Sequence, residues 1–454
     1  MRCYDLIAVG GGAGGLAAAR AAAIEGKRVA LVSDAPIGGD CTWTGCVPSK
    51  TLIAAAAEGA SFADAMARVH RTVEHIAGTE SAEVLHGEGV TVIEGRAVLR
   101  GQGVLDINGD RVTGDRIVLA TGAHPAVPPI PGLRDLAYLT NEDLWELTEA
   151  PRRLGILGGG PIGCELAQAM ARLGVDVTVF EMARQLLPSE EPEASAVVEK
   201  ALVADGVRVI LGQAVTEVNA IGSGGSAEII AGEHRVDVDK VLVAVGRVPN
   251  TADLGLEAAG VTLTDRGHIE VDSQLRTTAD HIWAVGDVNG LLPFTHAADE
   301  QGRLAAWGAV GRRMRWTFDA QRVPWTTFTS PEVARVGVAE AEAPRGAKVA
   351  FLPMAENDRA IAADRTDGFI KLIAAPRRVL RNLGGGRIVG ATVVGERAGE
   401  MIHEPAMLML LNGFTGRLAQ LTHAYPTWST GIQKCAAQFF QEIEGRSARP
   451  ARRG

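Results

Sequence analysis

The chain has 454 residues, more than one hydrophobic core usually organises, so two or three domains are expected. Its formal net charge of −9 argues against nucleic acid or an anionic membrane as the main partner. Five scattered cysteines are too few for a disulfide framework, which favours a reducing, cytoplasmic setting. The apolar stretch from Leu6 to Ala19 is too short to span a bilayer, and five glycines interrupt it.

The N-terminal segment predicts a nucleotide-binding unit. Tyr4 to Val9 has the pattern of a buried strand, and Gly10 to Gly15 follow it with the spacing G-x-G-x-x-G. An alanine-rich helix to about Ile24 and a strand from Arg28 to Val32 are expected next. In such a unit the first glycine makes the turn, the second admits a pyrophosphate and the third allows close helix packing. The candidate cofactor-binding residues are Gly10, Gly12, Gly14 and Gly15.

The end of the second strand departs from the usual pattern. An acidic residue normally stands there and binds a ribose hydroxyl, whereas this chain has Ser33 followed by Asp34. Either Asp34 reaches the ribose, or the hydroxyl of Ser33 replaces the carboxylate more weakly.

A second unit of the same kind begins with a strand from Arg153 to Leu157. Gly158 to Gly163 follow it, then a helix through about Leu173. The next strand, Val175 to Phe180, leads into Glu181. This acid can bind a free 2′-hydroxyl and would repel a 2′-phosphate, so NADH is favoured, while the nearby Arg184 keeps NADPH open. The candidate cofactor-binding residues are Gly158, Gly160, Gly163 and Glu181.

Two cysteines lie shortly after the first unit, within Gly38 to Lys50. Cys41 and Cys46 are separated by four residues. A dithiol beside a bound dinucleotide can pass electrons from a cofactor to a sulfur-containing or thiophilic acceptor. The first unit would then hold a flavin and the second a nicotinamide. The spacing also fits half of a zinc site, but the other three cysteines occur singly, so no metal centre is expected.

Six stretches resemble motifs of the pyridine nucleotide-disulfide oxidoreductases, the family that includes dihydrolipoamide dehydrogenase, glutathione reductase and mercuric reductase. They are Gly38–Lys50, Ala120–Ala123, the unit at Gly158, Gly246–Asn250, Ala284–Asp287 and Phe328–Glu332. The resemblance implies an α/β fold with two Rossmann-like dinucleotide-binding domains and a C-terminal α+β dimerisation domain. In the implied homodimer, the dimerisation domain completes the active site of the partner.

The resemblance also sets the expected domain limits. The FAD-binding domain would comprise residues 1–150 and 271–321, and the NAD(P)H-binding domain residues 151–270. The dimerisation domain would comprise residues 322–445, with strands at Val349 to Leu352 and Gly368 to Ile373. Residues 446–454 form a basic tail that is expected to be disordered.

Roles for individual residues follow from the same resemblance. FAD would lie across the first unit, with Asp287 on its sugar-like chain. Lys50 would stand near the flavin N5 and pair with Glu165. Cys46 would be the flavin-proximal thiol of a redox disulfide, and Cys41 the thiol that attacks the acceptor. The other residues implied to contact the cofactors are Gly39, Thr121, Gly122, Gly246 and Arg247.

The C-terminal motif departs from the family at its catalytic base. Disulfide-reducing members end in His-x-His-Pro-Thr-x-x-Glu, where this chain places Tyr425 for the second histidine and Thr430 for the glutamate. No carboxylate remains at position 430 to tune the phenol, and a tyrosine with a pKa near 10 is a poor base at neutral pH. Mercuric reductases also carry tyrosine here, and soft cations prefer thiolates. His423 is expected to be structural, and a packed interface aromatic is the alternative for Tyr425.

Three hypotheses follow. The leading one is an FAD-dependent NAD(P)H oxidoreductase that passes electrons through Cys41 and Cys46 to a thiophilic acceptor, such as a soft metal ion. The alternatives are a diverged dihydrolipoamide dehydrogenase or other small-disulfide reductase, and a flavin-bound redox sensor. The chain shows no Cys-x-x-Cys metal-binding domain and no C-terminal cysteine pair, so the match to mercuric reductase is incomplete. His296 and residues 356–359 are candidates near the acceptor, with plain loop positions as the alternative.

Overall fold

The structure is a computed structural model that describes residues 2–101, 103–222, 225–311, 317–377, 379 and 381–452. It divides into two compact units. Unit 1 comprises Met1–Pro128, Leu139–Ala150 and Leu242–Ala320, and unit 2 comprises Pro129–Tyr138, Pro151–Val241 and Gln321–Gly454. The predicted return to the FAD-binding domain at residue 271 falls inside the last segment of unit 1. The predicted NAD(P)H-binding segment contributes residues 151–241 to unit 2, which also holds the predicted dimerisation segment.

Unit 1 is built on a parallel sheet with the strand order β18-β8-β2-β3-β4. Its strands are Leu6–Val9 (β2), Val29–Ser33 (β3), Val90–Glu94 (β4), Ile117–Leu119 (β8) and Ile282–Ala284 (β18). The residues of β2, β3 and β8 are all buried, as expected for strands that are covered on both faces. Helix α1 (Ala13–Ile24) follows β2 and leads to β3, which confirms the predicted strand–helix–strand unit.

Small residues let two helices of unit 1 approach each other closely. A Cβ on Gly302 of α8 (Thr295–Ala309) would lie 2.2 Å from the carbonyl oxygen of Gly14 in α1. Only glycine at position 302 therefore permits this packing. The other helices of unit 1 are α2 (Gly39–Trp43), α3 (Cys46–Ala57), α4 (Phe62–Gly78) and α5 (Ala82–Gly87). The pair β17-β9 joins Arg247–Pro249 to Ala123–Pro125, and a further sheet, β1-β7-β6-β5, contains Arg2–Tyr4, Asp110–Gly114, Val104–Ile107 and Ala97–Leu99.

The N-terminal part of unit 2 repeats the nucleotide-binding pattern in the sheet β12-β11-β10-β16. Strand β10 (Arg153–Leu157) has the predicted bounds, α6 (Pro161–Arg172) follows it, and β11 (Asp176–Glu181) pairs parallel with β10. The remaining elements are α7 (Pro192–Ala204), β12 (Arg208–Leu211) and β16 (Lys240–Val243). A separate antiparallel sheet contains β13 (Val215–Ile221), β14 (Ser226–Ala231) and β15 (His234–Val238).

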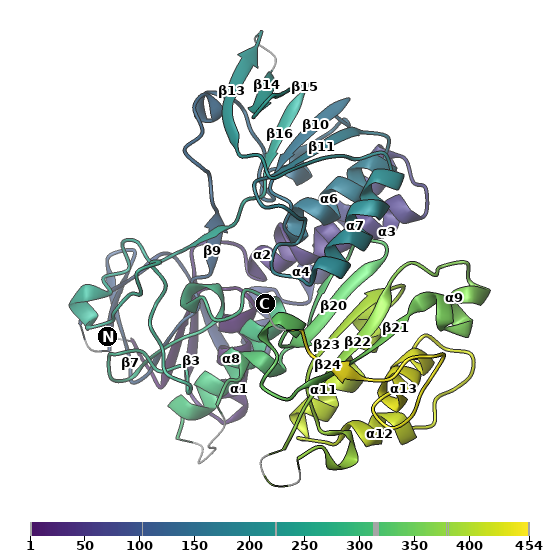
Figure 1. Cartoon of the computed structure of the whole chain (residues 1–454). Helices are drawn as coiled ribbons and strands as arrows, with labels where there is room; N and C mark the ends of the chain where they lie inside the picture. The colour runs from purple at the N-terminus through teal and green to yellow at the C-terminus, as the bar shows by residue number, and fades with distance from the viewer. Residues whose placement is uncertain are drawn as a thin grey trace. The chain divides into compact units, whose positions relative to one another are not determined.

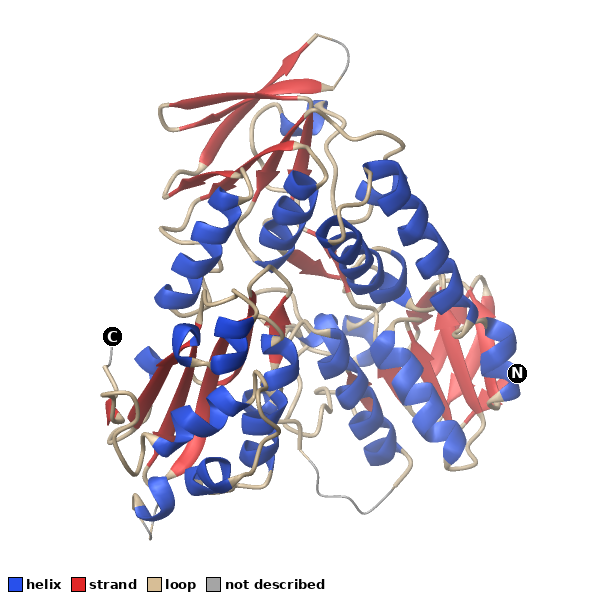
Figure 2. Ribbon diagram, turned by 90° about the vertical axis from the view of Figure 1, so that its right-hand side faces the viewer, coloured by secondary structure: helices blue, strands red, loops and turns tan. Residues whose placement is uncertain are grey.

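The C-terminal part of unit 2 is a six-stranded antiparallel sheet with helices beside it (Figure 1). Its order is β19-β20-β23-β22-β21-β24, with bounds Trp325–Thr327, Glu332–Gly337, Arg387–Gly395, Phe369–Ala375, Lys348–Pro353 and Arg449–Pro450. The helices are α9 (Asp358–Ala362), α10 (Ala398–Met401), α11 (His403–Leu410), α12 (Thr415–Gln420) and α13 (Thr430–Ala437). Strand β21 includes the predicted strand Val349 to Leu352, and β22 begins one residue after the predicted start at Gly368. The sheets and helices together (Figure 2) confirm the predicted fold class.

The structure differs from the expected disordered tail. Arg449 pairs in register with Val349 of β21, so residues 449–450 extend the sheet. The guanidinium of Arg449 also binds the carboxylate of Glu340, and Arg446 lies 2.9 Å from the carboxylate of Glu356. Composition alone suggested a solvated tail, but specific ion pairs order it through Arg452; the last two residues lie outside the described part of the chain. Within that part, no helix is long and apolar enough to cross a membrane.

Candidate active site

Two short helices of unit 1 bring the cysteines together. Cys41 lies in α2, and Cys46 is the first residue of α3. The turn between the helices is tight, because a Cβ on Gly45 would lie 2.8 Å from the carbonyl oxygen of Asp40. Both cysteines are free thiols in this structure, and their side chains form a hydrogen bond. That hydrogen bond, followed by burial, raises the pKa of Cys41, so the two thiols titrate as a pair.

The carbonyl oxygen of Thr44 anchors the turn between the cysteines. It accepts hydrogen bonds from the indole of Trp145, at 3.1 Å, and from the amide of Asn141, at 3.3 Å. Trp145 is buried, so its indole position is fixed by packing. On the other side, the indole of Trp43 donates to the carbonyl oxygen of Ile37 at 2.8 Å. These contacts fix the backbone that carries the two cysteines. A redox pair needs such support, because its two sulfur atoms must stay close enough to form a disulfide.

Thr295 is a site residue that the sequence analysis missed. Its hydroxyl oxygen lies 3.4 Å from the sulfur of Cys46, and its hydrogen bonding also lowers the pKa of Cys41. Thr295 is the first residue of α8, so the N-terminal end of that helix lies beside the thiols. A helix N-terminus favours negative charge and therefore thiolates. The sequence contains only a weak indication of this role, because a threonine at the start of a helix is usually interpreted as a helix-capping residue.

The start of α2, the helix that carries Cys41, lies against the first glycine turn. The amide of Gly38 donates to the carbonyl oxygen of Gly11 at 2.9 Å, and a Cβ on Gly39 would lie 2.7 Å from the Cα of Gly12. Gly10 has φ +114°, and a Cβ there would lie 2.1 Å from the carbonyl oxygen of Ala120. Glycines therefore let three backbone segments meet where a pyrophosphate is expected.

Ser33 and Asp34 have different surroundings at the end of β3. Ser33 is buried, and a Cβ on Gly11 would lie 2.7 Å from its hydroxyl oxygen. That hydroxyl donates to the carbonyl oxygen of Ala35 at 2.8 Å. Asp34 is exposed. Of the two candidates, only Ser33 is shown against the glycine turn.

Arg247 connects the cysteine segment with Asp287. Its guanidinium pairs with the carboxylate of Asp40, the residue before Cys41, and its Nε lies 3.3 Å from a carboxylate oxygen of Asp287. Burial raises the pKa of Asp287, while the positive charge of Arg247 opposes that rise. The Nε atom is buried and makes no hydrogen bond in the structure. A buried acid and an unsatisfied donor together form a polar place for a sugar-like chain.

Two further motifs of unit 1 are bonded to each other. The hydroxyl of Thr121 donates to the carbonyl oxygen of Asn250 at 2.7 Å, and the amide of Asn250 donates back to Thr121 at 2.8 Å. Gly122, at φ +69°, and Gly246, at φ +141°, turn the chain on either side of this contact. The two segments are therefore held together close to Arg247.

The glycine turn and the Asp287 region of unit 1 fit FAD. The N-terminus of α1 has no side-chain cap, so its amides can face a pyrophosphate. Gly10 to Gly15 would hold that pyrophosphate, and Asp287 would hold the sugar-like chain. This leaves the dithiol on the same side of unit 1 as the turn, as the contact of Gly39 with Gly12 requires.

In unit 2, Glu181 is the last residue of β11 and lies next to the second glycine turn. Its buried carboxylate accepts hydrogen bonds from the amides of Gly159 and Ala183, each at 2.7 Å. These bonds hold the carboxylate against the glycine turn that precedes α6. That turn contains the predicted cofactor-binding residues Gly158, Gly160 and Gly163. Arg184, the residue that would accept a 2′-phosphate, is exposed.

Glu165 is buried in α6 and accepts a hydrogen bond from the amide of Phe328 at 2.8 Å. Its expected partner, Lys50, belongs to α3 in unit 1, so their pairing stays a prediction. Lys50, Cys46 and Thr51 line one side of a pocket of about 450 Å³ in unit 1, and Arg68 and Thr72 of α4 line the other. The pocket brings a redox thiol and two cationic side chains to one surface.

Asp358, the first residue of α9, lies near Tyr425, whose side chain is 74% exposed. Hydrogen bonding to Asp358 and the negative charge of that carboxylate raise the pKa of Tyr425. Thr430, the residue at the glutamate position, instead donates to the carbonyl oxygen of Thr427. The sequence analysis named Asp358 among the candidates near the acceptor but did not connect it with Tyr425, because the two residues lie in different segments.

His423 is held by two oxygen atoms. One ring nitrogen lies 3.0 Å from the carbonyl oxygen of Leu421, and the other lies 2.9 Å from the carboxylate of Glu404. Its side chain is nearly buried. Both nitrogens are thus engaged within unit 2, as the predicted structural role of His423 requires.

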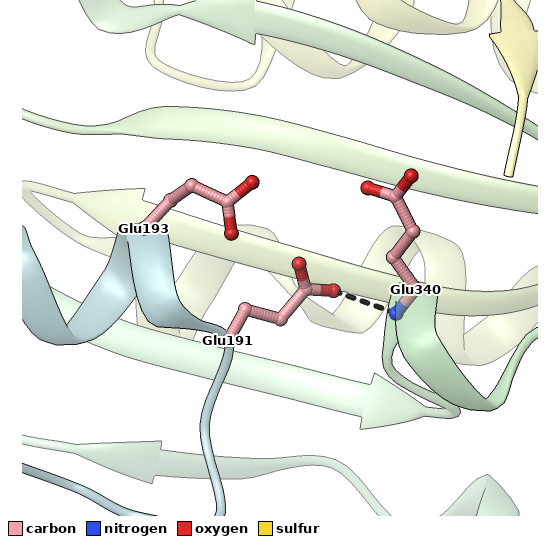
Figure 3. Close-up of side chains that lie close together, drawn as sticks. All are labelled: Glu191, Glu193 and Glu340. Carbon is pink, nitrogen blue, oxygen red and sulfur yellow. Dashed lines mark hydrogen bonds between the residues drawn. The ribbon is translucent and has the colours of Figure 1, made fainter. Parts of the chain in front are cut away.

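Three carboxylates meet elsewhere in unit 2, as Figure 3 shows for Glu191, Glu193 and Glu340. Their spacing alone would suit a metal ion. However, the ammonium of Lys371 pairs with Glu191 and lies 3.1 Å from Glu193 and 3.2 Å from Glu340. This buried cation lies among the three carboxylates, and Arg449 also pairs with Glu340, so the cluster is an ion-pair network rather than a metal site.

Most of the chain matches one family. Residues 4–302 match the pyridine nucleotide-disulphide oxidoreductases, and residues 323–436 match the dimerisation domain of the same family. The chain is 30% identical to a mercuric reductase of Bacillus cereus, over 97% of this chain and 72% of that protein. It is 32% identical to a dihydrolipoyl dehydrogenase of Thermus scotoductus, over 96% of this chain and 97% of that protein.

Solved structures agree with these matches. The Cu(II) complex of the HOCl-induced flavoprotein disulfide reductase RclA from Escherichia coli has a TM-score of 0.87 and 31% identity, covering 96% of this chain and 99% of that one. LpdA from Mycobacterium tuberculosis has a TM-score of 0.85 and 29% identity, covering 97% of this chain and all of that one. The chain therefore belongs to the pyridine nucleotide-disulfide oxidoreductases, NAD(P)H-dependent flavoenzymes that use FAD, and it carries the family's dimerisation domain.

Proposed function

We propose that this enzyme passes electrons from NADH through FAD and the Cys41–Cys46 pair to a thiophilic acceptor, a soft metal ion in the first place. The observation that carries the proposal is the thiol pair itself. The two side chains are hydrogen-bonded, rest on the first glycine turn and lie beside the N-terminus of α8.

Bound FAD supplies the two-electron carrier between the nicotinamide and the disulfide. Two electrons and one proton convert the Cys41–Cys46 disulfide into the Cys41 thiol and the Cys46 thiolate. The raised pKa of Cys41 keeps that thiol protonated while negative charge collects on Cys46, near Thr295. Cys46 would then be the flavin-proximal thiolate, and Cys41 would release its proton to solvent as its sulfur bonds to the acceptor. Lys50, which the family resemblance predicts to pair with Glu165, would face the flavin and stabilise the incoming charge.

Proton balance favours a metal ion over a disulfide as acceptor. Reduction of a disulfide by NADH consumes one proton and must protonate a leaving thiolate, whereas reduction of Hg(II) or Cu(II) by NADH releases a proton. The usual histidine donor is replaced by Tyr425, whose pKa is raised further above neutrality by Asp358. Thiolates bind soft cations directly, so this route needs no acid at position 425.

Glu181 supports NADH as the donor. Its buried carboxylate is oriented by two backbone amides, which suits a free 2′-hydroxyl and opposes a 2′-phosphate. The enzyme is expected to act as a homodimer in the reducing cytoplasm, with Tyr425 placed against the partner's dithiol.

The test measures NADH oxidation by the purified protein with Hg(II), Cu(II), lipoamide or oxidised glutathione as acceptor. Turnover with a metal ion is expected to exceed turnover with the disulfides, and NADPH is expected to be the weaker donor. Cys41→Ser and Cys46→Ser should abolish turnover, while Cys3→Ser, which changes an exposed cysteine, should not. Anaerobic reduction should produce a long-wavelength thiolate-to-flavin absorbance band that Cys46→Ser removes.

The alternatives predict other results. Fast lipoamide turnover that Tyr425→Phe leaves unchanged would identify a diverged dihydrolipoamide dehydrogenase and overturn the metal assignment. Slow flavin reduction by NADH with every acceptor would favour a redox sensor.

A further inference from the structure

Asp40 lies beside the turn that is expected to bind the pyrophosphate of FAD. The residue before it touches that turn, since a Cβ on Gly39 would lie 2.7 Å from the Cα of Gly12. The carbonyl oxygen of Asp40 accepts a hydrogen bond from the amide of Thr44 at 2.9 Å, within the segment that carries both cysteines. The backbone of Asp40 is therefore fixed next to the glycine turn.

The carboxylate of Asp40 occupies the guanidinium of Arg247. The two groups form an ion pair, and the same nitrogen of Arg247 also donates to the carbonyl oxygen of Ala123. The Nε atom of Arg247 lies 3.3 Å from a carboxylate oxygen of Asp287. Arg247 belongs to β17, which pairs with β9, so its backbone is held as well. Two carboxylates thus share one cation at this place in unit 1.

The negative charge of Asp40 acts on its surroundings in spite of the pairing with Arg247. Burial raises the pKa of Asp287, Arg247 opposes that rise, and the charge of Asp40 adds to it. Burial also raises the pKa of Glu142, and the charge of Asp40 raises it further. Both shifts mean that additional negative charge is disfavoured here. The pyrophosphate of FAD brings negative charge to the neighbouring glycine turn and would meet the same repulsion.

We propose that Asp40 weakens the binding of FAD and so determines how readily the enzyme releases its cofactor. Its carboxylate competes with the pyrophosphate for the guanidinium of Arg247 and adds negative charge beside the glycine turn. The proposal rests on the proposed function for the place of FAD across Gly10 to Gly15. The side chain of Asp40 is 46% exposed, so solvent screens its charge. An effect of about two- to fivefold on the release of FAD is expected for a charge in such a position.

The first test measures how fast the purified holoprotein exchanges its bound FAD for an excess of isotopically labelled FAD, which requires no turnover. Asp40→Asn keeps the size of the side chain and removes its charge, so it is expected to slow the release of FAD by about two- to fivefold. Asp40→Glu keeps the charge and should release FAD at nearly the wild-type rate. Release from Asp40→Asn that is as fast as from the wild type, or faster, would overturn the proposal, as would equally slow release from Asp40→Glu.

The matched control is Asp5→Asn, which also removes the charge of a carboxylate paired with an arginine. Asp5 lies 3.0 Å from Arg28 and directly precedes β2, whereas the glycine turn follows that strand. The two sites are therefore at opposite ends of β2, and Asp5→Asn should exchange FAD like the wild type. Slower release from Asp5→Asn by the same factor would show a general effect of protein charge and contradict the proposal.

The second test repeats the exchange at higher ionic strength. Salt screens the charge of Asp40, so the difference between the wild type and Asp40→Asn should shrink from about 0.05 M to about 0.5 M NaCl. A difference that does not change with salt would assign the effect to the hydrogen bonding of the side chain and would contradict the proposal.

The role of Asp40 and the proposed function can fail separately. Slower FAD release from Asp40→Asn in a protein that reduces neither Hg(II) nor Cu(II) would support the role of Asp40 and overturn the proposed acceptor. Turnover with a metal ion, together with equal FAD release from the wild type and Asp40→Asn, would overturn only the role of Asp40. A purified protein that holds no FAD would overturn both.

Discussion

Arg247 pairs with Asp40, which directly precedes Cys41, and the same guanidinium lies 3.3 Å from the carboxylate of Asp287. One cation therefore serves two carboxylates that are far apart in the sequence and close together in unit 1. Burial raises the pKa of Asp287, and the positive charge of Arg247 is the main influence that opposes the rise, with a smaller one from His268. Arg247 thus contributes both to holding the cysteine segment and to the charge of the expected FAD site.

Arg247→Met is expected to destabilise the folded protein and to weaken FAD binding. Loss of hydrogen bonds to charged groups should lower the free energy of unfolding by about 1.5–3 kcal/mol, and FAD should be released more readily. Flavin content after dialysis and denaturant unfolding of the apoprotein measure the two effects. Arg276→Met is the control, because Arg276 pairs with Asp272 at 3.5 Å in an exposed position where an ion pair contributes little. Equal effects of the two substitutions would contradict the assignment.

Thr295→Val is expected to slow the chemistry of the thiols without unfolding the protein. The hydroxyl of Thr295 lowers the pKa of Cys41 and lies 3.4 Å from the sulfur of Cys46. Its removal should disfavour the thiolates by about 1 kcal/mol, which is roughly a fivefold slower alkylation by iodoacetamide at a given pH. Mass spectrometry of the NADH-reduced protein gives the rate at each cysteine.

Thr51→Val provides the comparison for that experiment. The Thr51 hydroxyl lies in the same helix as Cys46 but donates to the carbonyl oxygen of Val47 at 2.8 Å. Alkylation in this variant should match the wild type. If both valine variants react like the wild type, Thr295 has no electrostatic role.

Local patterns predicted the parts of this fold that depend on local sequence. Strand β10 has the predicted bounds, and α1 ends at the predicted Ile24, because glycine turns and apolar strands are encoded within a few residues. The contacts of Cys46 with Thr295 and of Asp40 with Arg247 join residues more than 200 positions apart. Local sequence patterns cannot predict contacts at that separation. The influence of Asp358 on Tyr425 has the same character, since the two residues lie 67 positions apart and the C-terminal motif does not connect them.

The ordered tail of unit 2 predicts a specific sensitivity to acid. Although burial alone would raise the pKa of Glu340, hydrogen bonds from Arg449, the amide of Arg452 and Lys371 lower it to about 2. A carboxyl group whose pKa is lowered in the folded state stabilises the protein at pH values above its pKa in the unfolded chain, which is 4.5 for Glu340. This stabilisation is lost as the pH falls from 4.5 toward 2. Arg449→Met should flatten the pH dependence of the unfolding free energy within that range. An unchanged slope would show that the tail does not stabilise the charged form of Glu340.

Lys371 gives the largest expected loss of stability. Its ammonium is 1% exposed and pairs with the buried carboxylate of Glu191 (Figure 3 shows that carboxylate with its neighbours). Lys371→Met would leave buried carboxylates without a counter-charge, so the free energy of unfolding should fall by about 3–5 kcal/mol. Lys200→Met is the matched control, because Lys200 pairs with Asp367 on the surface, where the loss should stay below about 1 kcal/mol. Adding Glu191→Gln to Lys371→Met should restore part of the stability, since it removes one of the uncompensated charges. A double variant no more stable than Lys371→Met would show that packing, and not charge, accounts for the loss.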